Sequence, residues 1–231
     1  MGGQACIWYG AAEFSRDTDV AVLASEENIT ALREALRVLR AKRIAFPPFE
    51  QQFLIRGHAI HFRCFHPEAM NMRIDIMSVM RGLDPFDQLW LRRSLLQSDD
   101  GLSFNVLSLP DLVRAKKTQR DKDWPMIRRL IESDYIAQIH PSPDHIKFWL
   151  LESRTPAMLV ELARLYRSEV EAAISFRSLL QTVIDGNESS ISDALEQEEK
   201  LIRDIDRAYW LPLKKELEEF RHSSTSIDEE V

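Results

Sequence analysis

Residues 16–23 of the chain read Arg16-Asp-Thr-Asp-Val-Ala-Val-Leu23. Its β-branched residues stand at alternate positions, which predicts a short strand. The alternation places Asp17, Asp19 and Ala21 on one face of that strand. The Cα atoms of positions i and i+2 lie about 6.6 Å apart in a strand. The two carboxylates can therefore converge on a pair of divalent cations roughly 3.5–4 Å apart, as in two-metal phosphoryl-transfer sites. The alternative is a strand end whose acids are merely exposed.

A second strand supplies a candidate third carboxylate. Met72-Arg-Ile-Asp-Ile-Met77 alternates in the same way and places Asp75 on one face with Arg73 and Met77. An acid between two isoleucines needs a partner. We expect a metal ion, and the alternative is a structural ion pair with Arg73. Mg²⁺ favours oxygen ligands and keeps water and substrate phosphates in its remaining positions, so three aspartates suffice for Mg²⁺ or Mn²⁺. We also expect repulsion to raise the pKa of at least one of these aspartates.

Two other features flank these strands. Gly2-Gly3 leads into a short helix that ends near Tyr9, and it offers unhindered backbone N–H groups and a positive helix end to a triphosphate. After the first strand, Ser25 is a good N-cap for an amphipathic helix. Between the two strands, Phe53 to Ile55 and Ala59 to Phe65 are predicted to form a hairpin around the Arg56-Gly57 pair.

From Ser108 onward the pattern is helical. Ser108-Leu-Pro-Asp111 is a capping signal, and Asp123-Trp-Pro125 restarts a helix. Beyond residue 141 we expect only helices: one long helix from Thr155-Pro156 to about residue 185, and a last one from about Ser190 to Arg207, with an interruption near Leu211-Pro212. The acidic tail after His222 is expected to be disordered.

Composition bounds the class of protein. The chain has 231 residues, of which 45% are hydrophobic and 29% charged, the balance of a soluble globular protein. The net charge of −7 argues against a protein that coats nucleic acid. Cys6 and Cys64 form no disulfide framework, which fits a cytoplasmic location. We find no signal peptide and no apolar run long enough to span a bilayer, so no membrane partner is expected.

The group His58, His61, Cys64 and His66 has the residue types of a zinc site but not the geometry. On an extended strand, His58 and His66 would lie about 26 Å apart, and His61 would face away from Cys64. One tetrahedral ion cannot gather these side chains, which argues against a zinc site there.

Together these residues resemble a known family. Gly2-Gly-Gln-Ala5, Gly10 and Ser15-Arg-Asp-Thr-Asp-Val20 resemble the Gly-Gly/Ser…Asp-x-Asp signature of the DNA polymerase β-like nucleotidyltransferase superfamily. More narrowly, the chain is similar to the AbiEii-type toxin nucleotidyltransferases and their uncharacterised bacterial relatives. Those proteins show a later Leu-x-x-x-Lys…Arg-x-Lys-Asp helix, matched here by Leu112-Val-Arg-Ala-Lys116 and Arg120-Asp-Lys-Asp123. In one respect the chain departs from the family, whose Gly-Gly pair is preceded by a helix and a strand.

The resemblance covers residues 1 to about 135 and implies an α+β fold. We expect a nucleotidyltransferase-like mixed β-sheet with packed helices over residues 1–138. An all-helical C-terminal region over residues 139–231 should follow.

The resemblance also implies roles for individual residues. Asp17 and Asp19 would ligate both metals, and Asp75 would ligate one and act as general base. The nucleotide would be held by residues from the Gly-Gly turn, the first strand and the basic helix: Gly2, Gly3, Ser15, Arg16, Lys116 and Arg120. Lys116 and Arg120 share a helix face. We expect them to neutralise the triphosphate with Arg16 orienting the site, and Lys117 is the alternative. The competing interpretation of this basic run is a solvated helix face.

Two functions follow from these expectations. The first is an enzyme that transfers a nucleoside monophosphate from a nucleoside triphosphate to a hydroxyl acceptor, which is RNA, protein or a small molecule, with release of pyrophosphate. The second is a non-catalytic protein of the same fold that senses a nucleotide or binds a partner. The C-terminal helices could cap the active site, bind an acceptor or form a homodimer.

Overall fold

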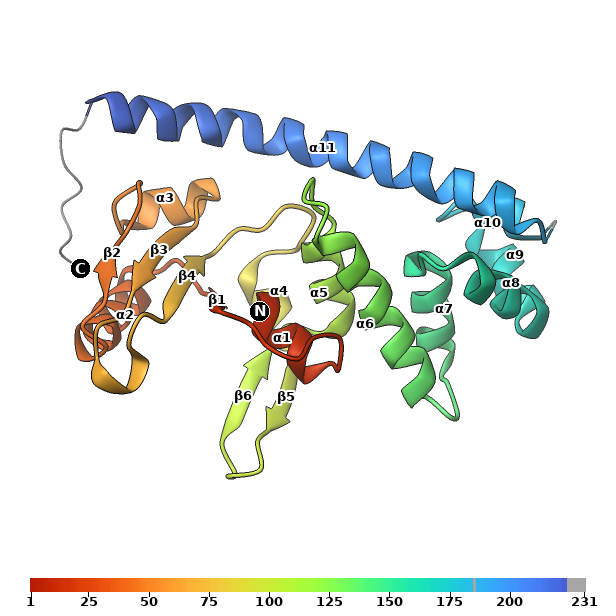
Figure 1. Ribbon diagram of the computed structural model, residues 1–231, viewed down its shortest axis with the longest axis horizontal. Coiled ribbons are helices and arrows are strands. Elements are labelled where there is room, and N and C mark those ends of the chain that lie inside the picture. The colour runs from red at the N-terminus through yellow and green to blue at the C-terminus, as the bar shows by residue number, and fades with distance from the viewer. Residues whose placement is uncertain (185, 224–231) are drawn as a thin grey trace. The chain divides into compact units, whose positions relative to one another are not determined.

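The structure is a computed structural model that describes residues 1–184 and 186–223 (Figure 1). It is a mixed α+β protein in which no strand follows Val106 among the described residues. The chain forms two compact units. The first unit contains Met1–Trp8, Ala12–Ala115 and the chain from Ala208 onward, and the second contains Tyr9–Ala11 and Lys116–Arg207. This division differs from the expected boundary after residue 138, because the second unit begins earlier and the last helix contributes to both units.

The first unit is organised around a four-stranded mixed sheet in the order β1-β4-β3-β2. Its strands are β1 (Asp17–Ala21), β2 (Lys42–Arg43), β3 (Ile60–Arg63) and β4 (Arg73–Met77). β1 lies at one edge and runs parallel to β4, and the other pairs are antiparallel. A separate antiparallel hairpin contains β5 (Ser94–Gln97) and β6 (Ser103–Val106), so the expectation of one single sheet is wrong.

Short helices accompany these strands. They are α1 (Gly2–Trp8), α2 (Glu26–Val38), α3 (Gln51–Arg56), the 3₁₀ turn η1 (Pro67–Ala69), α4 (Phe86–Leu91) and α5 (Leu109–Lys116). The predicted cap of α2 is confirmed, because the Ser25 side chain accepts a hydrogen bond from the Asn28 backbone N–H at 3.2 Å.

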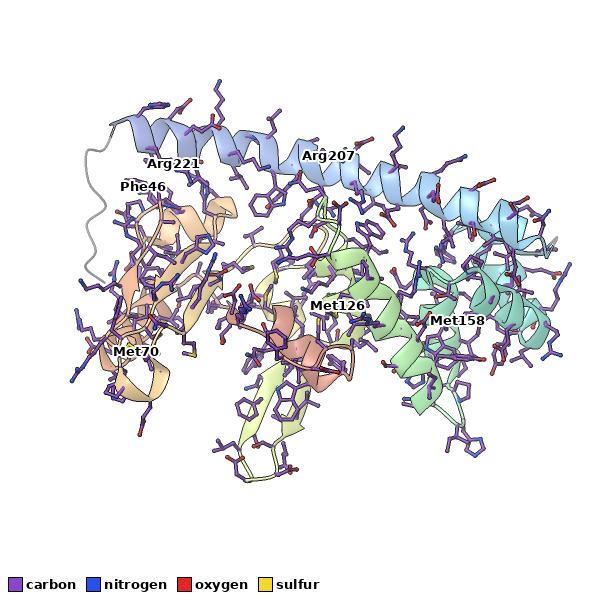
Figure 2. All side chains as sticks on the ribbon, viewed as in Figure 1. Phe46, Met70, Met126, Met158, Arg207 and Arg221 are labelled. Atoms are coloured by element: carbon purple, nitrogen blue, oxygen red, sulfur yellow. The ribbon has the colours of Figure 1, made fainter. Side chains whose placement is uncertain are left out.

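One face of the sheet is apolar and forms the core of this unit. The buried side chains come from β3, β4, α2, α3 and the adjoining segments: Val22, Ile29, Leu36, Ala41, Phe49, Phe53, Leu54, Ile60, Phe62, Cys64, Ile74 and Ile76. Phe220 of α11 (Glu188–Ser223) packs against this cluster, with its ring centroid 5.2 Å from that of Phe53 and 6.5 Å from that of Phe46. Figure 2 shows the side chains of this region and labels Phe46. Each large apolar side chain buried here contributes roughly 1.5–3 kcal/mol.

The predicted hairpin around Arg56-Gly57 is wrong. Residues 53–55 belong to helix α3, and only Ile60–Arg63 forms a strand. Phe53 and Leu54 are both buried, so the apolar periodicity of about 3.6 residues that marks a helix is not visible in so short a segment. Gly57 ends the helix with φ 101°, the left-handed conformation favoured at this position. A Cβ at Gly57 would also lie 2.7 Å from the Tyr209 hydroxyl.

The second unit is helical. It contains α6 (Asp123–Ala137), α7 (Pro143–Glu152), α8 (Pro156–Leu165), α9 (Arg167–Ala173), α10 (Leu180–Ile184) and the first part of α11. The single long helix expected after Thr155 is wrong, because Tyr166 leaves helical geometry and a second break precedes Leu180. The expected interruption at Leu211-Pro212 is also wrong. Proline removes only one N–H donor, and α11 continues through it. The expected tail disorder falls on residues outside the described range.

Five charged side chains form what we call the buried ionic cluster of the second unit. Glu198 accepts hydrogen bonds from Arg177 at 2.8 and 3.1 Å and from Arg154, and Lys117 pairs with Glu152. Burial alone would raise the pKa of Glu198, but the hydrogen bonds and charges of these arginines outweigh it and lower that pKa. Desolvation lowers the pKa of Lys117 and of Arg154. The cluster therefore has three cations for two carboxylates, with both arginines buried and the other three side chains partly buried.

None of the helices within the described ranges combines the length and apolar character needed to cross a bilayer.

Candidate active site

The polar face of the four-stranded sheet carries the three aspartates. The strand register pairs Asp19 of β1 with Asp75 of β4, and Asp75 with His61 of β3. Side chains of paired residues point to the same face of a sheet, so these three residues form one row. Asp17 is paired with Arg73 in a neighbouring row on that face. Asp75 therefore shares one face of the sheet with Asp17 and Asp19.

Asp75 has two partners within this arrangement. Its Oδ1 accepts a hydrogen bond from Arg73 Nε at 2.8 Å and lies 2.8 Å from His61 Nδ1. Burial by itself would raise the pKa of Asp75, but the hydrogen bonds from His61 and Arg73 outweigh it, and the net pKa lies below its usual range. Asp75 is therefore not the aspartate with the raised pKa that we expected in this cluster, because a cation lies beside its carboxylate.

Arg73 is the common counter-ion of the three aspartates. Its hydrogen bond to Asp75 raises its pKa, and the charges of Asp17 and Asp19 raise that pKa further. The alternative interpretation of Asp75 as one half of an ion pair with Arg73 is thus present in the structure. The guanidinium offsets one of the three negative charges that the aspartates place on this sheet face.

We expect Asp75 to make the first unit sensitive to acid. Its folded-state pKa lies below the unfolded value of about 4, so its stabilising effect is complete above that pH and is lost as the pH falls through the folded-state pKa. Urea denaturation between pH 7 and pH 3 measures this effect. Below about pH 4 the free energy of unfolding should fall less steeply in Asp75→Asn than in the wild type, by up to about 1.4 kcal/mol per pH unit. Equal slopes in both proteins would contradict this assignment.

The Gly-Gly pair lies directly beside the acidic strand. A Cβ at Gly2 would lie 1.7 Å from Asp19 Oδ2, and Gly2 has a left-handed backbone with φ +66°. A Cβ at Gly3 would lie 2.2 Å from Ser15 Oγ, and that hydroxyl donates a hydrogen bond to the Asp17 carbonyl at 2.9 Å. Both positions are closed to any side chain, so the glycines are required by the close approach of α1 to β1.

The donor set fits Mg²⁺ in its chemistry. Three carboxylates share one face, and both partners of Asp75 use Oδ1, which leaves Oδ2 without a hydrogen bond among the described residues. In the described part of the chain, however, no three His, Cys, Asp or Glu side chains have the arrangement of a metal site. With Arg73 in place, an ion could reach Asp75 only through Oδ2, and use of both oxygens would require the Arg73 side chain to move away.

A pocket of about 260 Å³ lies along β1 within the first unit. Its walls come from α1, β1, α4, β6 and the segments beside them, and its polar and aromatic lining consists of Gln4, Trp8, Thr18, Asp19, Phe86, Trp90, Arg93, Phe104 and Asn105. We call it the aromatic pocket. Trp8 and Phe104 face each other with ring centroids 5.4 Å apart. Asp19 therefore belongs both to the acidic row and to the wall of this pocket.

The far wall of the aromatic pocket is held by two neighbouring arginines. Arg92 donates to both carboxylate oxygens of the buried Asp111, at 2.6 and 2.9 Å, which ties the end of α4 to the start of α5. Arg93 lies over the Trp90 ring at 4.0 Å and donates from Nε to Asn105 Oδ1 at 2.7 Å. Burial would raise the pKa of Asp111, but the hydrogen bonds from Arg92 and Ser108 lower it overall. Charged hydrogen bonds of this kind fix the wall more firmly than neutral ones.

Comparison of the chain with models of known protein families, with curated proteins and with solved structures found no match. Its function is therefore inferred from the residues and geometry of the site itself.

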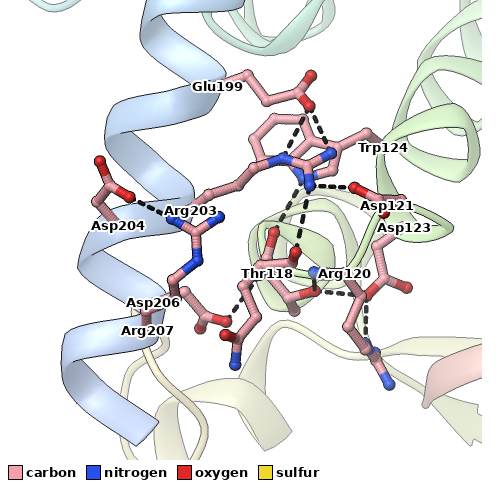
Figure 3. Close-up of polar contacts among 11 residues, drawn as sticks. Thr118, Arg120, Asp121, Asp123, Trp124, Glu199, Arg203, Asp204, Asp206 and Arg207 are labelled. Atoms are coloured by element: carbon pink, nitrogen blue, oxygen red, sulfur yellow. Dashed lines mark hydrogen bonds and ion pairs between the residues drawn. The ribbon is translucent and has the colours of Figure 1, made fainter. Parts of the chain in front are cut away.

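The two predicted phosphate ligands of the basic helix belong to the second unit. Lys116 Nζ lies 3.4 Å from Asp123 Oδ1, and Arg120 Nε donates to Asp123 Oδ2 at 2.7 Å. Thr118 Oγ1 donates to the same Oδ2 at 2.6 Å, and Figure 3 shows Thr118 and Arg120 beside Asp123. The buried Asp123 thus has donors from the end of α5 and from the loop before α6. Lys116 and Arg120 thus have a local partner that a basic pattern alone does not reveal.

The remaining predicted residues divide between the two units. Arg16 is exposed, and its side chain forms no ion pair among the described residues. Lys117, the alternative phosphate ligand, belongs to the buried ionic cluster.

Several site residues were not predicted. His61 was considered only as part of a zinc group, yet it lies against Asp75, and His58 instead lies 2.8 Å from Glu216. Trp90 and Asn105 were not singled out. The available signal for β5 and β6 was Asp100-Gly101 between two short alternating runs, a typical hairpin turn.

Proposed function

We propose that this chain is a metal-dependent nucleotidyltransferase, with a fold of the DNA polymerase β-like type. It would transfer a nucleoside monophosphate from a nucleoside triphosphate to a hydroxyl of RNA, of a protein or of a small molecule. The observation that carries the proposal is the register that sets Asp19 opposite Asp75, with Asp17 on the same face. The close approach of Gly2 to the Asp19 carboxylate is a second, independent feature of the same site.

Each residue has a defined task in this proposal. Asp17, Asp19 and Asp75 would hold Mg²⁺ or Mn²⁺, which when bound neutralises the triphosphate and orients it. Asp75 Oδ2 accepts the proton of the attacking hydroxyl. The hydroxyl oxygen forms a bond to the α-phosphorus, the bond from that phosphorus to the bridging oxygen breaks, and pyrophosphate leaves. Gly2, Gly3 and Ser15 position the acidic strand beside α1.

The roles of the outlying cations stay predictions. Contact of Lys116 or Arg120 with the triphosphate would require these side chains to exchange Asp123 for phosphate. The Arg16 side chain is exposed, and among the described residues no carboxylate pairs with it that a phosphate would have to displace. A homodimer through the C-terminal helices likewise stays a prediction.

One observation favours a second candidate, a nucleotide-binding protein of the same fold that does no chemistry. The Arg73 guanidinium already lies beside Asp75 and offsets one of the three negative charges of Asp17, Asp19 and Asp75. In this candidate Arg73 keeps its place beside Asp75, and a nucleotide binds without Mg²⁺.

Labelled nucleoside triphosphates distinguish these two candidates. The full chain is incubated with α-³²P-labelled ATP, CTP, GTP and UTP, with Mg²⁺ or EDTA, and with separate RNA, protein and small-molecule fractions of a cell lysate. We expect Mg²⁺-dependent transfer of label, with loss of at least about 100-fold in Asp19→Asn, because a metal ligand is removed from the reacting centre.

The matched control is Asp87→Asn, which changes an exposed acid in the first turn of α4 and should retain full transfer. Calorimetric titration with Mg²⁺ provides the second measurement. Arg73→Gln should bind Mg²⁺ more tightly than the wild type if the guanidinium competes with the metal. Nucleotide binding that is equal in Mg²⁺ and EDTA, without transfer to any fraction, would establish the non-catalytic candidate instead.

A further inference from the structure

We propose that the aromatic pocket binds the nucleobase and selects bases with a carbonyl at purine C6 or pyrimidine C4, guanine and uracil, over adenine and cytosine, which carry an amino group there. The inference rests on the proposed function in one respect, that the ligand of the acidic row is a nucleotide. It adds the identity of the base and the residue that recognises it.

The pocket has the shape and lining that a planar ring requires. Its volume of about 260 Å³ is below the roughly 300–1,000 Å³ of sites for drug-sized ligands, so it suits a single ring system. Trp8, Trp90 and Phe104 each leave more than a third of their surface exposed at this one place. Stacking of a base on such side chains is sequence-tolerant and typically contributes about 1–3 kcal/mol per base.

The orientation of the Asn105 amide supplies the discrimination. Arg93 Nε can only donate, so the Asn105 atom 2.7 Å away must be the oxygen. The same guanidinium also donates to the Trp90 carbonyl at 2.6 Å and lies over the Trp90 ring, which fixes its position. Rotation of the Asn105 amide by 180° would place its NH₂ group against Arg93 Nε, and both of these groups are donors. The Asn105 NH₂ group is therefore held away from Arg93, and it has no hydrogen-bond partner within residues 1–184 and 186–223.

Asn105 is one of the residues that line the pocket, and in this proposal its NH₂ donor lies against the base, where it distinguishes two kinds of base. Guanine and uracil present a carbonyl acceptor, O6 or O4, where adenine and cytosine present an amino donor, N6 or N4. A base carbonyl would accept a hydrogen bond from the Asn105 NH₂ group. A base amino group is itself a donor, so no hydrogen bond would form between the two groups. Because β1 contributes Thr18 to Ala21 to this pocket and Asp19 to the acidic row, the base and phosphates of one nucleotide can be held by the same strand.

The test exchanges the donor for an acceptor. Asn105→Asp keeps an oxygen for Arg93 Nε but replaces the NH₂ group by a second acceptor oxygen. Calorimetry with the full chain measures the dissociation constants of the nucleosides guanosine, uridine, adenosine and cytidine in EDTA, and of the four triphosphates with Mg²⁺. In the wild type we expect guanosine and uridine to bind about ten-fold or more tightly than adenosine and cytidine. In Asn105→Asp this order should reverse. The ratio is the readout, because an added carboxylate also weakens all triphosphates equally.

A pair of aromatic variants tests the stacking. Phe104→Ala should weaken all four nucleosides by a similar factor of about ten, without changing their order. Phe14→Ala is the matched control, because Phe14 is an exposed phenylalanine of the same unit that does not line the pocket. It should leave all four dissociation constants unchanged.

The outcomes separate this inference from the proposed transfer reaction. Carbonyl-base preference that reverses in Asn105→Asp supports the pocket assignment even if no transfer is observed, which would overturn only the enzymatic proposal. Transfer without base preference, or with a preference that Asn105→Asp does not alter, would overturn the pocket assignment alone. Failure of every nucleoside and triphosphate to bind would overturn both.

Discussion

Replacing Glu198 by Ala lowers the free energy of unfolding by about 3–5 kcal/mol, the usual effect of removing one partner of a buried ion pair. Glu198 is the carboxylate on which Arg154 and Arg177 both depend, and the side chains of these arginines are only 5% and 4% exposed. Arg154 Nε already lacks a hydrogen-bond partner. Without Glu198, three cations would face the single carboxylate of Glu152 in a buried site. Urea denaturation followed by circular dichroism measures the change.

The matched control is Glu171→Ala. It removes an acid from an i,i+4 pair with Arg167 in the same helical unit, but both side chains are 56% exposed. Exposed pairs of this kind contribute about 0–1 kcal/mol. If Glu198→Ala and Glu171→Ala shift the urea midpoint equally, the buried ionic cluster does not hold the second unit together.

Replacing Gly2 by Ala should have the largest effect on the acidic site. The new Cβ would lie 1.7 Å from Asp19 Oδ2, so the Asp19 side chain must move, and the residue must also adopt φ +66°. A displacement of about 1 Å at a reacting centre can reduce the rate about 100-fold. We therefore expect Mg²⁺-dependent transfer to fall by about that factor, measured with the α-labelled triphosphates.

Gly82→Ala separates the steric clash from the backbone cost. Gly82 has φ +74°, but a Cβ there would meet no atom within 4 Å. It should cost stability only, about 1–2 kcal/mol for a non-glycine residue in the left-handed region, and leave transfer intact. Equal activity of the two variants would show that the close approach of Gly2 to Asp19 has no role in the reaction.

Sequence patterns predicted the elements whose local signals agree with their tertiary surroundings. The alternation in residues 16–23 and 72–77 predicted β1 and β4. Because side chains two residues apart share a face of a strand, it also correctly grouped Asp17 with Asp19 and Arg73 with Asp75. The alternation within each strand cannot show that the two strands are neighbours, that they run parallel, or that Asp19 stands opposite Asp75. Those facts depend on strand pairing over more than 50 residues of chain. Pairing also decides the charge balance, because His61 reaches Asp75 only through β3.

The errors have equally physical causes. Residues 53–55 have side chains that are common in strands, but they form part of helix α3. The helix buries Phe53 and Leu54 within one turn and ends at Gly57, which has a left-handed backbone. The basic run at residues 114–120 predicted a helix face shared by Lys116 and Arg120, which is wrong, because α5 ends at Lys116 and Arg120 lies in the segment before α6. The run also did not reveal the partner, since Asp123 is contributed by the next helix. The break before α10 is occupied by Arg177, whose guanidinium donates to the Leu150 and Ser153 carbonyls at 2.9 and 3.0 Å. Such tertiary hydrogen bonds leave no periodic trace in a sequence.

The return of α11 to the first unit has a consequence for synthesis on the ribosome. Phe220 packs on the core beside Phe53, and Glu216 pairs with the buried His58, although 158 residues separate the two. Translation proceeds at roughly 5–20 residues per second, so a partner 158 residues further along the chain emerges about 8–32 s later. During that interval we expect the nascent sheet to expose an apolar surface around Phe46 and Phe53. We therefore expect chaperones to bind the first unit while its own last helix is still being made.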